Sequence, residues 1–132
     1  MILVDTSVWI DFLKSKENGK TAKLNEILEL KIPFGITGQI YQEVLQGAAT
    51  EKDFRSLKEY FDTFLFYTPL DEKDSYSKAA EIFFLCQKAG VTVRSSADCL
   101  IAQIARERSL KLLHNDKDFD NISKIVRDVE IY

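Results

Sequence analysis

Acidic residues at four places in this sequence could together hold a divalent cation. Asp5 directly follows an apolar run, Asp116 closely follows another, Asp98 lies in the first turn of a predicted helix, and Glu43 lies at the edge of a predicted buried helix stripe. Carboxylates gathered in one recess repel one another, and a divalent ion relieves that repulsion. Oxygen-only ligand sets favour hard ions such as Mg²⁺ or Mn²⁺, and such sites commonly handle phosphate. If the four acids converge, they would support metal-assisted phosphate hydrolysis.

Each acid also has a purely structural interpretation. An acid after a strand commonly caps a helix or forms a turn, and the spacing of Ser95 and Asp98 fits a capping box. Asp98 is nevertheless followed on its helix face by Ala102 and Ala105, whereas Gln103 is expected on the wetter side. An acid whose helix face continues with small, packed side chains lies in a recess rather than in open solvent. We therefore expect Asp98 to be partly shielded from solvent.

Strands that alternate with helices must position these acids. Strands are expected at residues 2–4, 33–36, 66–68, 110–114 and 129–132, and helices at 8–14, 21–30, 38–46, 75–88, 97–108 and 119–125, with helical spacing also over 54–64. This alternation predicts an α/β fold of three layers, α/β/α, with a short, mainly parallel sheet. Sites in such sheets form beyond the carboxyl ends of the strands, which places Asp5 and Asp116 at the same edge. We expect one domain over residues 1–132.

Composition excludes several classes of protein. The 132 residues are 45% hydrophobic and 30% charged, with five Gly and two Pro, which excludes a disordered or low-complexity chain. Cys86 and Cys99 fit no zinc motif and are expected to be buried free thiols. The net charge of −3 is not that of a protein that coats nucleic acid. No apolar stretch approaches the roughly 18–20 residues of a membrane span, so we expect a soluble, cytoplasmic protein.

Other phosphate-handling classes do not fit. A haloacid-dehalogenase-type phosphatase needs a second acid two residues after the first, where this chain has Ser7. A receiver domain needs an acidic pair after the first strand and a phosphoacceptor after the third, and this sequence has neither. No P-loop motif is present. The single histidine, His114, stays open between a general base and a structural residue of its predicted strand, and the neighbouring Asn115 has no assigned role.

Four blocks of the sequence resemble those of PIN-domain proteins of the VapC toxin type. They are ILVDTSVWI at residues 2–10, IT at 36–37 leading to EVLQG at 43–47, ADCLIA at 97–102, and LLHNDKDF at 112–119. Each block alone is weak, but all four fall in the family's order in a chain of the family's size. The resemblance therefore covers essentially the whole chain.

The resemblance implies a metal-dependent endoribonuclease that acts as the toxin of a toxin–antitoxin pair. Matching positions make Asp5, Glu43, Asp98 and Asp116 the catalytic acids around one or two Mg²⁺ or Mn²⁺ ions. Thr6 matches a hydroxyl position that orients the first aspartate or its water, and Asp118 matches an acidic position that is only sometimes a ligand. The implied partners are a VapB-like antitoxin, an RNA substrate and a second copy of the chain in a homodimer. Which RNA is cleaved stays open.

Basic and aromatic side chains offer further binding surfaces. Arg94 and Lys117 are candidates for contacts with RNA phosphates, although each could be an ordinary surface charge. In the predicted helix at 75–88, an inward face is expected from Tyr76, Ala79, Ala80, Phe83 and Phe84. If the core does not hold all the aromatic residues of 54–67 and 76–84, an exposed aromatic surface would instead bind a short amphipathic antitoxin segment. Such a segment would direct a basic residue toward Asp5 and Asp98.

Two alternatives for the function stay open. One is a PIN-fold nuclease that processes RNA outside a toxin pair, and the other is a non-catalytic PIN-fold binding module. The four intact acids argue against the module, and the compact chain favours the toxin. Metal-dependent cleavage and a small antitoxin gene immediately upstream would distinguish these alternatives.

Overall fold

Five short strands form one parallel sheet in the computed structural model, which describes residues 1–132. The strands are β1 (Ile2–Val4), β2 (Phe34–Ile36), β3 (Leu65–Phe66), β4 (Lys111–Leu113) and β5 (Glu130–Ile131). Their order across the sheet is β3-β2-β1-β4-β5, and every neighbouring pair is parallel. All five predicted strands are present, so the prediction of a short parallel sheet is confirmed.

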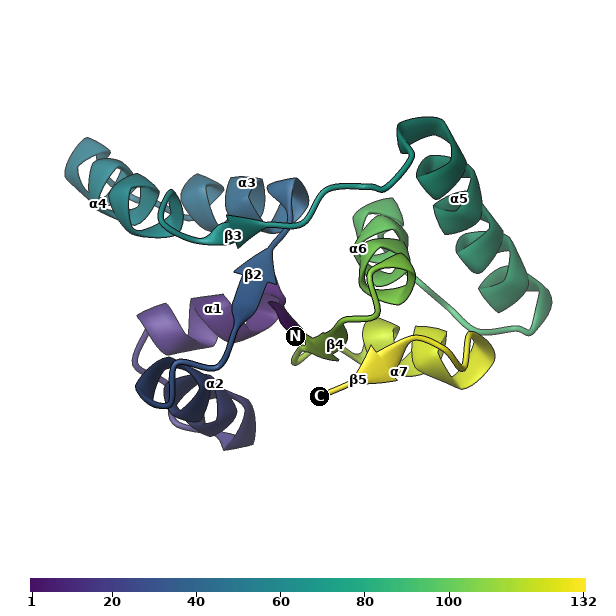
Figure 1. Ribbon diagram of the computed structural model, residues 1–132, viewed down its shortest axis with the longest axis horizontal. Coiled ribbons are helices and arrows are strands. Elements are labelled where there is room, and N and C mark those ends of the chain that lie inside the picture. Colours follow the sequence, from purple (N-terminus) through teal and green to yellow (C-terminus); the bar gives the residue numbers. More distant parts are fainter.

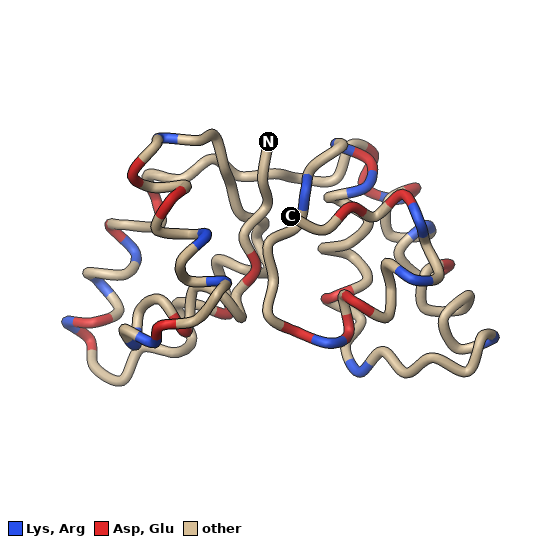
Figure 2. Tube along the Cα trace, turned by 90° about the horizontal axis from the view of Figure 1, so that it is seen from below, with Lys and Arg blue, Asp and Glu red and all other residues tan.

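Seven helices connect and cover the strands. They are α1 (Thr6–Leu13), α2 (Gly19–Glu29), α3 (Gly38–Gln46), α4 (Glu51–Phe61), α5 (Glu72–Lys88), α6 (Ser96–Glu107) and α7 (Lys117–Ile125). Helices α1–α4 lie on one side of the central strands and α5–α7 on the other, which gives the predicted three layers (Figure 1). Lys and Arg are interspersed with Asp and Glu over both groups of helices (Figure 2). No helix has the length and apolar character that crossing a membrane requires.

The central strand β1 brings two loops of the candidate site together. Its three residues are buried, and Val4 lies opposite Leu113 of β4 in the register. The Asp5 N–H then donates to the Leu113 carbonyl oxygen at 2.9 Å, which extends the pairing by one residue. As a result, Asp5 lies beside the segment 114–116 that follows β4.

Side-chain caps fix where the site helices begin. Asp5 itself caps α1 by accepting a hydrogen bond from the Ser7 N–H. Thr37 caps α3, and Ser95 caps α6. The Ser95 hydroxyl accepts from the N–H of Ala97 rather than from that of Asp98.

Two expectations about inward faces are wrong. The buried face of α5 consists of Ser75, Ala79, Ile82 and Cys86. The aromatic residues that were expected on this face are exposed instead: Tyr76 by 51%, Phe83 by 40% and Phe84 by 57%. Ala80 is exposed as well. Helix α5 carries two stripes at helical spacing, and the one with smaller side chains packs against α6. On α6, Gln103 is buried rather than on the wet side. Cys86 and Cys99 are buried free thiols, as expected.

Candidate metal centre

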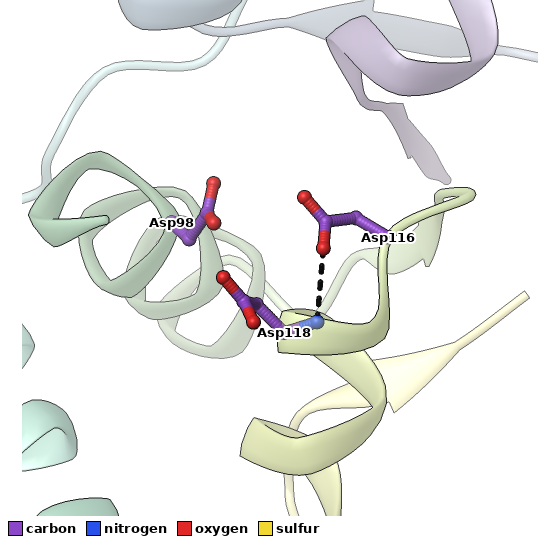
Figure 3. A group of neighbouring side chains, drawn as sticks. All are labelled: Asp98, Asp116 and Asp118. Carbon is purple, nitrogen blue, oxygen red and sulfur yellow. Dashed lines mark hydrogen bonds between the residues drawn. The ribbon is translucent and has the colours of Figure 1, made fainter. Parts of the chain in front are cut away.

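Three carboxylates come together at the carboxyl edge of the sheet. One oxygen from each of Asp98, Asp116 and Asp118 lies within 4.8 Å of the others. Figure 3 shows Asp98 reaching from α6 toward the two aspartates at the start of α7. We call these three residues the acidic cluster. Asp98 and Asp116 are two of the four predicted catalytic acids. Asp118 matches a position that, by the resemblance, is only sometimes a ligand.

The turn between β4 and α7 positions Asp116 and Asp118. Asp116 caps α7, and its Oδ1 accepts a hydrogen bond from the Asp118 N–H at 3.0 Å (Figure 3). Asp118 lies in the first turn of the helix, where the positive end of the helix dipole favours a negative charge. Only 4% of Asp118 is exposed, so its carboxylate is held at the bottom of the cluster.

The hydroxyl of Ser7 holds the Asp5 carboxylate, a contact that was not predicted from the sequence. The Ser7 N–H and the Ser7 hydroxyl donate to Asp5 Oδ2 at 3.0 and 2.7 Å. The Ser7 Oγ in turn accepts from the Asn115 N–H at 2.8 Å, which ties α1 to the turn after β4. A serine two residues after an aspartate is the sequence feature from which the bond between Ser7 and Asp5 could have been predicted. The Thr6 hydroxyl is buried without a hydrogen-bond partner, so its expected role toward a water stays a prediction.

Glu43 lies near the cluster but outside it. It is exposed on α3, and the pKa of its carboxyl is raised first by desolvation and then by the charges of Asp5 and Asp116. Asp5 and Asp116 follow two neighbouring strands, and their charges reach Glu43, so Glu43 lies near the same edge of the sheet. Of the four predicted acids, only Asp98 and Asp116 belong to the acidic cluster.

The site has an excess of negative charge. Burial raises the pKa of Asp5, and the charge of Asp116 raises it further. The pKa of Asp98 is raised to about 7, first by desolvation and then by the charges of Asp5, Asp116, Asp118 and Glu43. No ion pair reaches Asp5, Glu43 or Asp98. A divalent cation would offset this repulsion.

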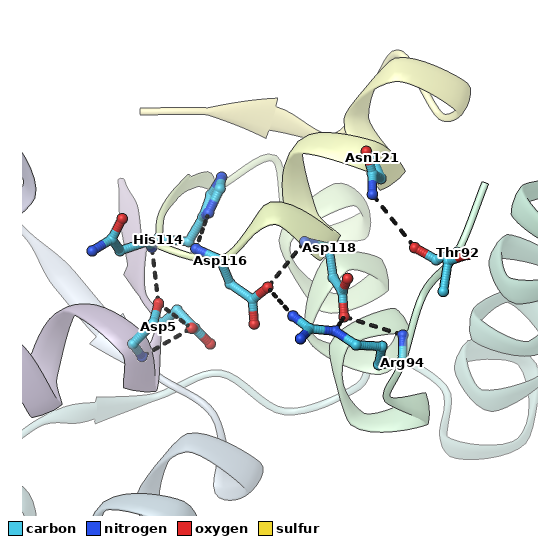
Figure 4. A network of polar contacts seen from close by, with 9 residues as sticks. Asp5, Thr92, Arg94, His114, Asp116, Asp118 and Asn121 are labelled. Carbon is cyan, nitrogen blue, oxygen red and sulfur yellow. Dashed lines mark hydrogen bonds and ion pairs between the residues drawn. The ribbon is translucent and has the colours of Figure 1, made fainter.

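Arg94 is the one basic residue paired with the acidic cluster. Its guanidinium bonds Asp116 Oδ1 and Asp118 Oδ2, each at 3.2 Å, and its backbone N–H donates to Asp118 Oδ2 at 3.1 Å (Figure 4). The predicted contact of Arg94 with RNA would therefore compete with these ion pairs. Lys117, the other predicted RNA contact, is exposed at the start of α7.

The donor set suits a hard divalent ion. Carboxylate oxygens are the only side-chain donors of the cluster, and the single histidine directs its Nδ1 to a backbone N–H. Mg²⁺ and Mn²⁺ prefer such oxygen ligands, and the distance from a hard cation to a ligand oxygen is about 2.0–2.6 Å. The oxygens of the cluster lie within 4.8 Å of one another, so modest side-chain movements would bring them around one ion. The acidic cluster can therefore hold a divalent cation.

Comparison with known proteins agrees with the fold. The PIN domain model matches residues 2–125. The chain is 31% identical over 126 residues to Ribonuclease VapC11 of Mycobacterium tuberculosis and to VapC ribonuclease Mb1587 of Mycobacterium bovis. Each alignment covers 95% of this chain and 93% of the relative.

Solved structures share the architecture. VapBC2 from Rickettsia felis, bound to a DNA fragment from its promoter, superposes with a TM-score of 0.73 at 15% identity, over 100% of this chain and 98% of that chain. FitAcB from Neisseria gonorrhoeae superposes with a TM-score of 0.70 at 22% identity, over 100% and 96%. Since the PIN domain model matches residues 2–125 of this 132-residue chain and VapC ribonucleases are among its relatives, this chain belongs to the PIN-domain family, in its VapC type.

Proposed function

We propose that this chain is an endoribonuclease that acts as the toxin of a toxin–antitoxin pair and hydrolyses RNA with Mg²⁺ or Mn²⁺. The observation that carries the proposal is the acidic cluster, which lies beside two further carboxylates and has Arg94 as its only paired base. Such an arrangement is costly for a protein without a cation. The VapC ribonucleases to which the chain is 31% identical support RNA as the substrate.

The acids divide the work of binding and orienting the ion. Asp98, Asp116 and Asp118 would supply the closest oxygens, while Asp5 and Glu43 would complete the site for one or two ions. When bound, a divalent ion activates water for attack on phosphorus and stabilises the charge on the leaving oxygen. Ser7 holds Asp5 in a fixed orientation, which limits the rearrangement that binding requires.

The RNA backbone would approach over the rim of the site. Lys117 is exposed one residue after Asp116, so it can reach a phosphate next to the scissile one. Arg94 would turn from Asp116 and Asp118 toward RNA once an ion neutralises those carboxylates. Both residues act as phosphate contacts, which carry affinity without reading base sequence.

The antitoxin would bind an apolar surface next to the acidic cluster. Tyr76 and Phe83, both exposed on α5, line a groove together with Ala97 and Leu100 of α6. Ala97 directly precedes Asp98, so an amphipathic segment in this groove would bring a basic side chain to the carboxylates. The VapBC and FitAcB structures that share this fold support a partner chain. The homodimer is proposed from the family resemblance alone.

An RNA cleavage assay tests the proposal. The purified chain should cleave RNA with Mg²⁺ or Mn²⁺, lose activity in EDTA, and lose it again when the product of the neighbouring upstream gene is added in excess. Asp116→Asn should be inactive, whereas Asp128→Asn, which alters an exposed acid paired with Arg106, should stay active. Activity that survives EDTA would contradict the metal requirement. Activity that is unchanged by the upstream gene product would contradict only the toxin–antitoxin assignment.

A further inference from the structure

His114 is the buried residue of the turn that carries Asp116. Asn115 and Lys117 on either side of Asp116 are exposed, whereas only 2% of His114 is accessible to solvent. Its ring packs against the ring of Phe119, with the centroids 5.2 Å apart, and Phe119 is fully buried in the core. The core therefore fixes the imidazole independently of the acids at the surface of the site.

The fixed imidazole bonds the backbone of a cluster residue. His114 Nδ1 accepts a hydrogen bond from the Asp116 N–H at 3.1 Å (Figure 4). Asp116 caps α7, and no helix carbonyl accepts from its own N–H. The ring and the Asp116 carboxylate lie on opposite sides of the turn (Figure 4), so the bond fixes the backbone without occupying a carboxylate oxygen.

The same geometry excludes His114 as a ligand or a base at the site. Nδ1 is occupied by the Asp116 N–H, so the proton of the neutral ring is on Nε2. Nε2 has no hydrogen bond, and its nearest charged neighbour is Asp120 Oδ1 at 3.4 Å, on the exposed side of α7. The ring therefore reaches the chemistry only through Asp116.

We propose that His114 is a positioning residue, which holds the Asp116 carboxylate at the metal centre through the hydrogen bond from the Asp116 N–H to His114 Nδ1. This inference rests on the proposed metal site. Without an acceptor at Nδ1, the Asp116 N–H would lose its partner, and the carboxylate would be held only by its own bonds with the Asp118 N–H and Arg94, of which Arg94 is displaced when an ion binds. Residues that orient metal ligands in this way typically contribute 10–100-fold to metal affinity.

Three substitutions separate positioning from packing. His114→Asn keeps an acceptor near the position of Nδ1, and an Asn side chain readily accepts from the N–H two residues later. His114→Gln carries its amide at the position of Nε2 instead and offers no acceptor to Asp116. His114→Leu has no acceptor at all. All three lose the imidazole contact with Phe119, so their unfolding midpoints should all fall.

Calorimetric titration of the full chain with MnCl₂, in the absence of RNA, tests the inference. We expect His114→Asn to bind Mn²⁺ within about 3-fold of the parent affinity, and His114→Gln and His114→Leu to lose about 10-fold or more. Equal affinities of the Asn and Gln variants, or parental affinity of the Leu variant, would overturn the inference and leave the metal site standing. A parent chain that binds no Mn²⁺ would overturn the proposed function and this inference with it.

Discussion

Replacing Asp98 by Asn should stabilise the metal-free protein at neutral and alkaline pH. The pKa of Asp98 is about 7 in the folded protein, against an ordinary value of 3.8, because burial and the charges of Asp5 and Asp116 disfavour its carboxylate. Between pH 3.8 and about pH 7, the Asp98 carboxyl of the folded protein keeps a proton that the unfolded chain has released. The parent therefore loses stability as the pH rises from about 4 to about 7. Asn has no charge to bury, so the variant avoids this loss.

The expected gain in the free energy of unfolding is about 2 kcal/mol at pH 8. The difference between a pKa of about 7 and one of 3.8 corresponds to at most about 4 kcal/mol. Solvent reaches part of the Asp98 carboxyl group and screens its interactions, which reduces the gain to about half. The gain should grow as the pH rises toward 7 and stay constant above that.

Urea unfolding in EDTA at pH 4.5, 6 and 8 measures this gain. Asp74→Asn is the matched control, because Asp74 is an exposed acid of α5 that pairs with Lys78, and it should change stability by less than about 0.5 kcal/mol. Saturating Mn²⁺ should reverse the order of parent and Asp98→Asn, since an ion that binds the folded parent stabilises it. An Asp98→Asn protein that is less stable than the parent at pH 8 in EDTA would refute the reasoning, and so would a gain that does not change with pH.

Three further outcomes follow from the structure. Cleaved RNA should carry 5′-phosphate and 3′-hydroxyl ends when analysed by mass spectrometry, because water rather than the 2′-hydroxyl attacks; 2′,3′-cyclic phosphate ends would exclude this route. Arg94→Leu should tighten Mn²⁺ binding several-fold in calorimetry, because the guanidinium, 3.2 Å from Asp116 Oδ1 and from Asp118 Oδ2, competes with the ion; weaker binding would show that Arg94 supports the site. Gly35→Ala should lower the free energy of unfolding by about 1–3 kcal/mol in urea titrations, because a Cβ would lie 2.5 Å from a ring carbon of Tyr67; an unchanged stability would show that β3 shifts freely.

The alternation of apolar runs was sufficient to predict the layers of this fold. Short runs such as residues 2–4 have few ways to bury every side chain other than in a parallel sheet covered on both faces. The sequence did not determine which face of α5 is buried. Its aromatic stripe, with Tyr76 and Phe84, is as periodic as the stripe of small residues, and only the close approach of α6 selects the small one.

The sequence was sufficient to predict the site residues that follow strands, but not the contacts that other segments make with them. Asp5 directly follows its strand, and Asp116 follows β4 by three residues, so topology places both at one edge. Asp118 and Arg94 meet only because the segment before α6 crosses the start of α7, a contact between residues 24 apart in the sequence. The positioning role proposed for His114 depends on which ring nitrogen bonds the Asp116 N–H, and only the three-dimensional structure shows that.

Anomalous diffraction from crystals of the chain soaked in MnCl₂ is the most direct test of the central claim that the acidic cluster is a metal centre. We expect an anomalous peak between Asp98 and Asp116, within about 2–2.6 Å of carboxylate oxygens from both, with the Arg94 guanidinium displaced from Asp116. An anomalous map from saturating Mn²⁺ with no peak at these carboxylates, and with Arg94 still paired to Asp116, would contradict it.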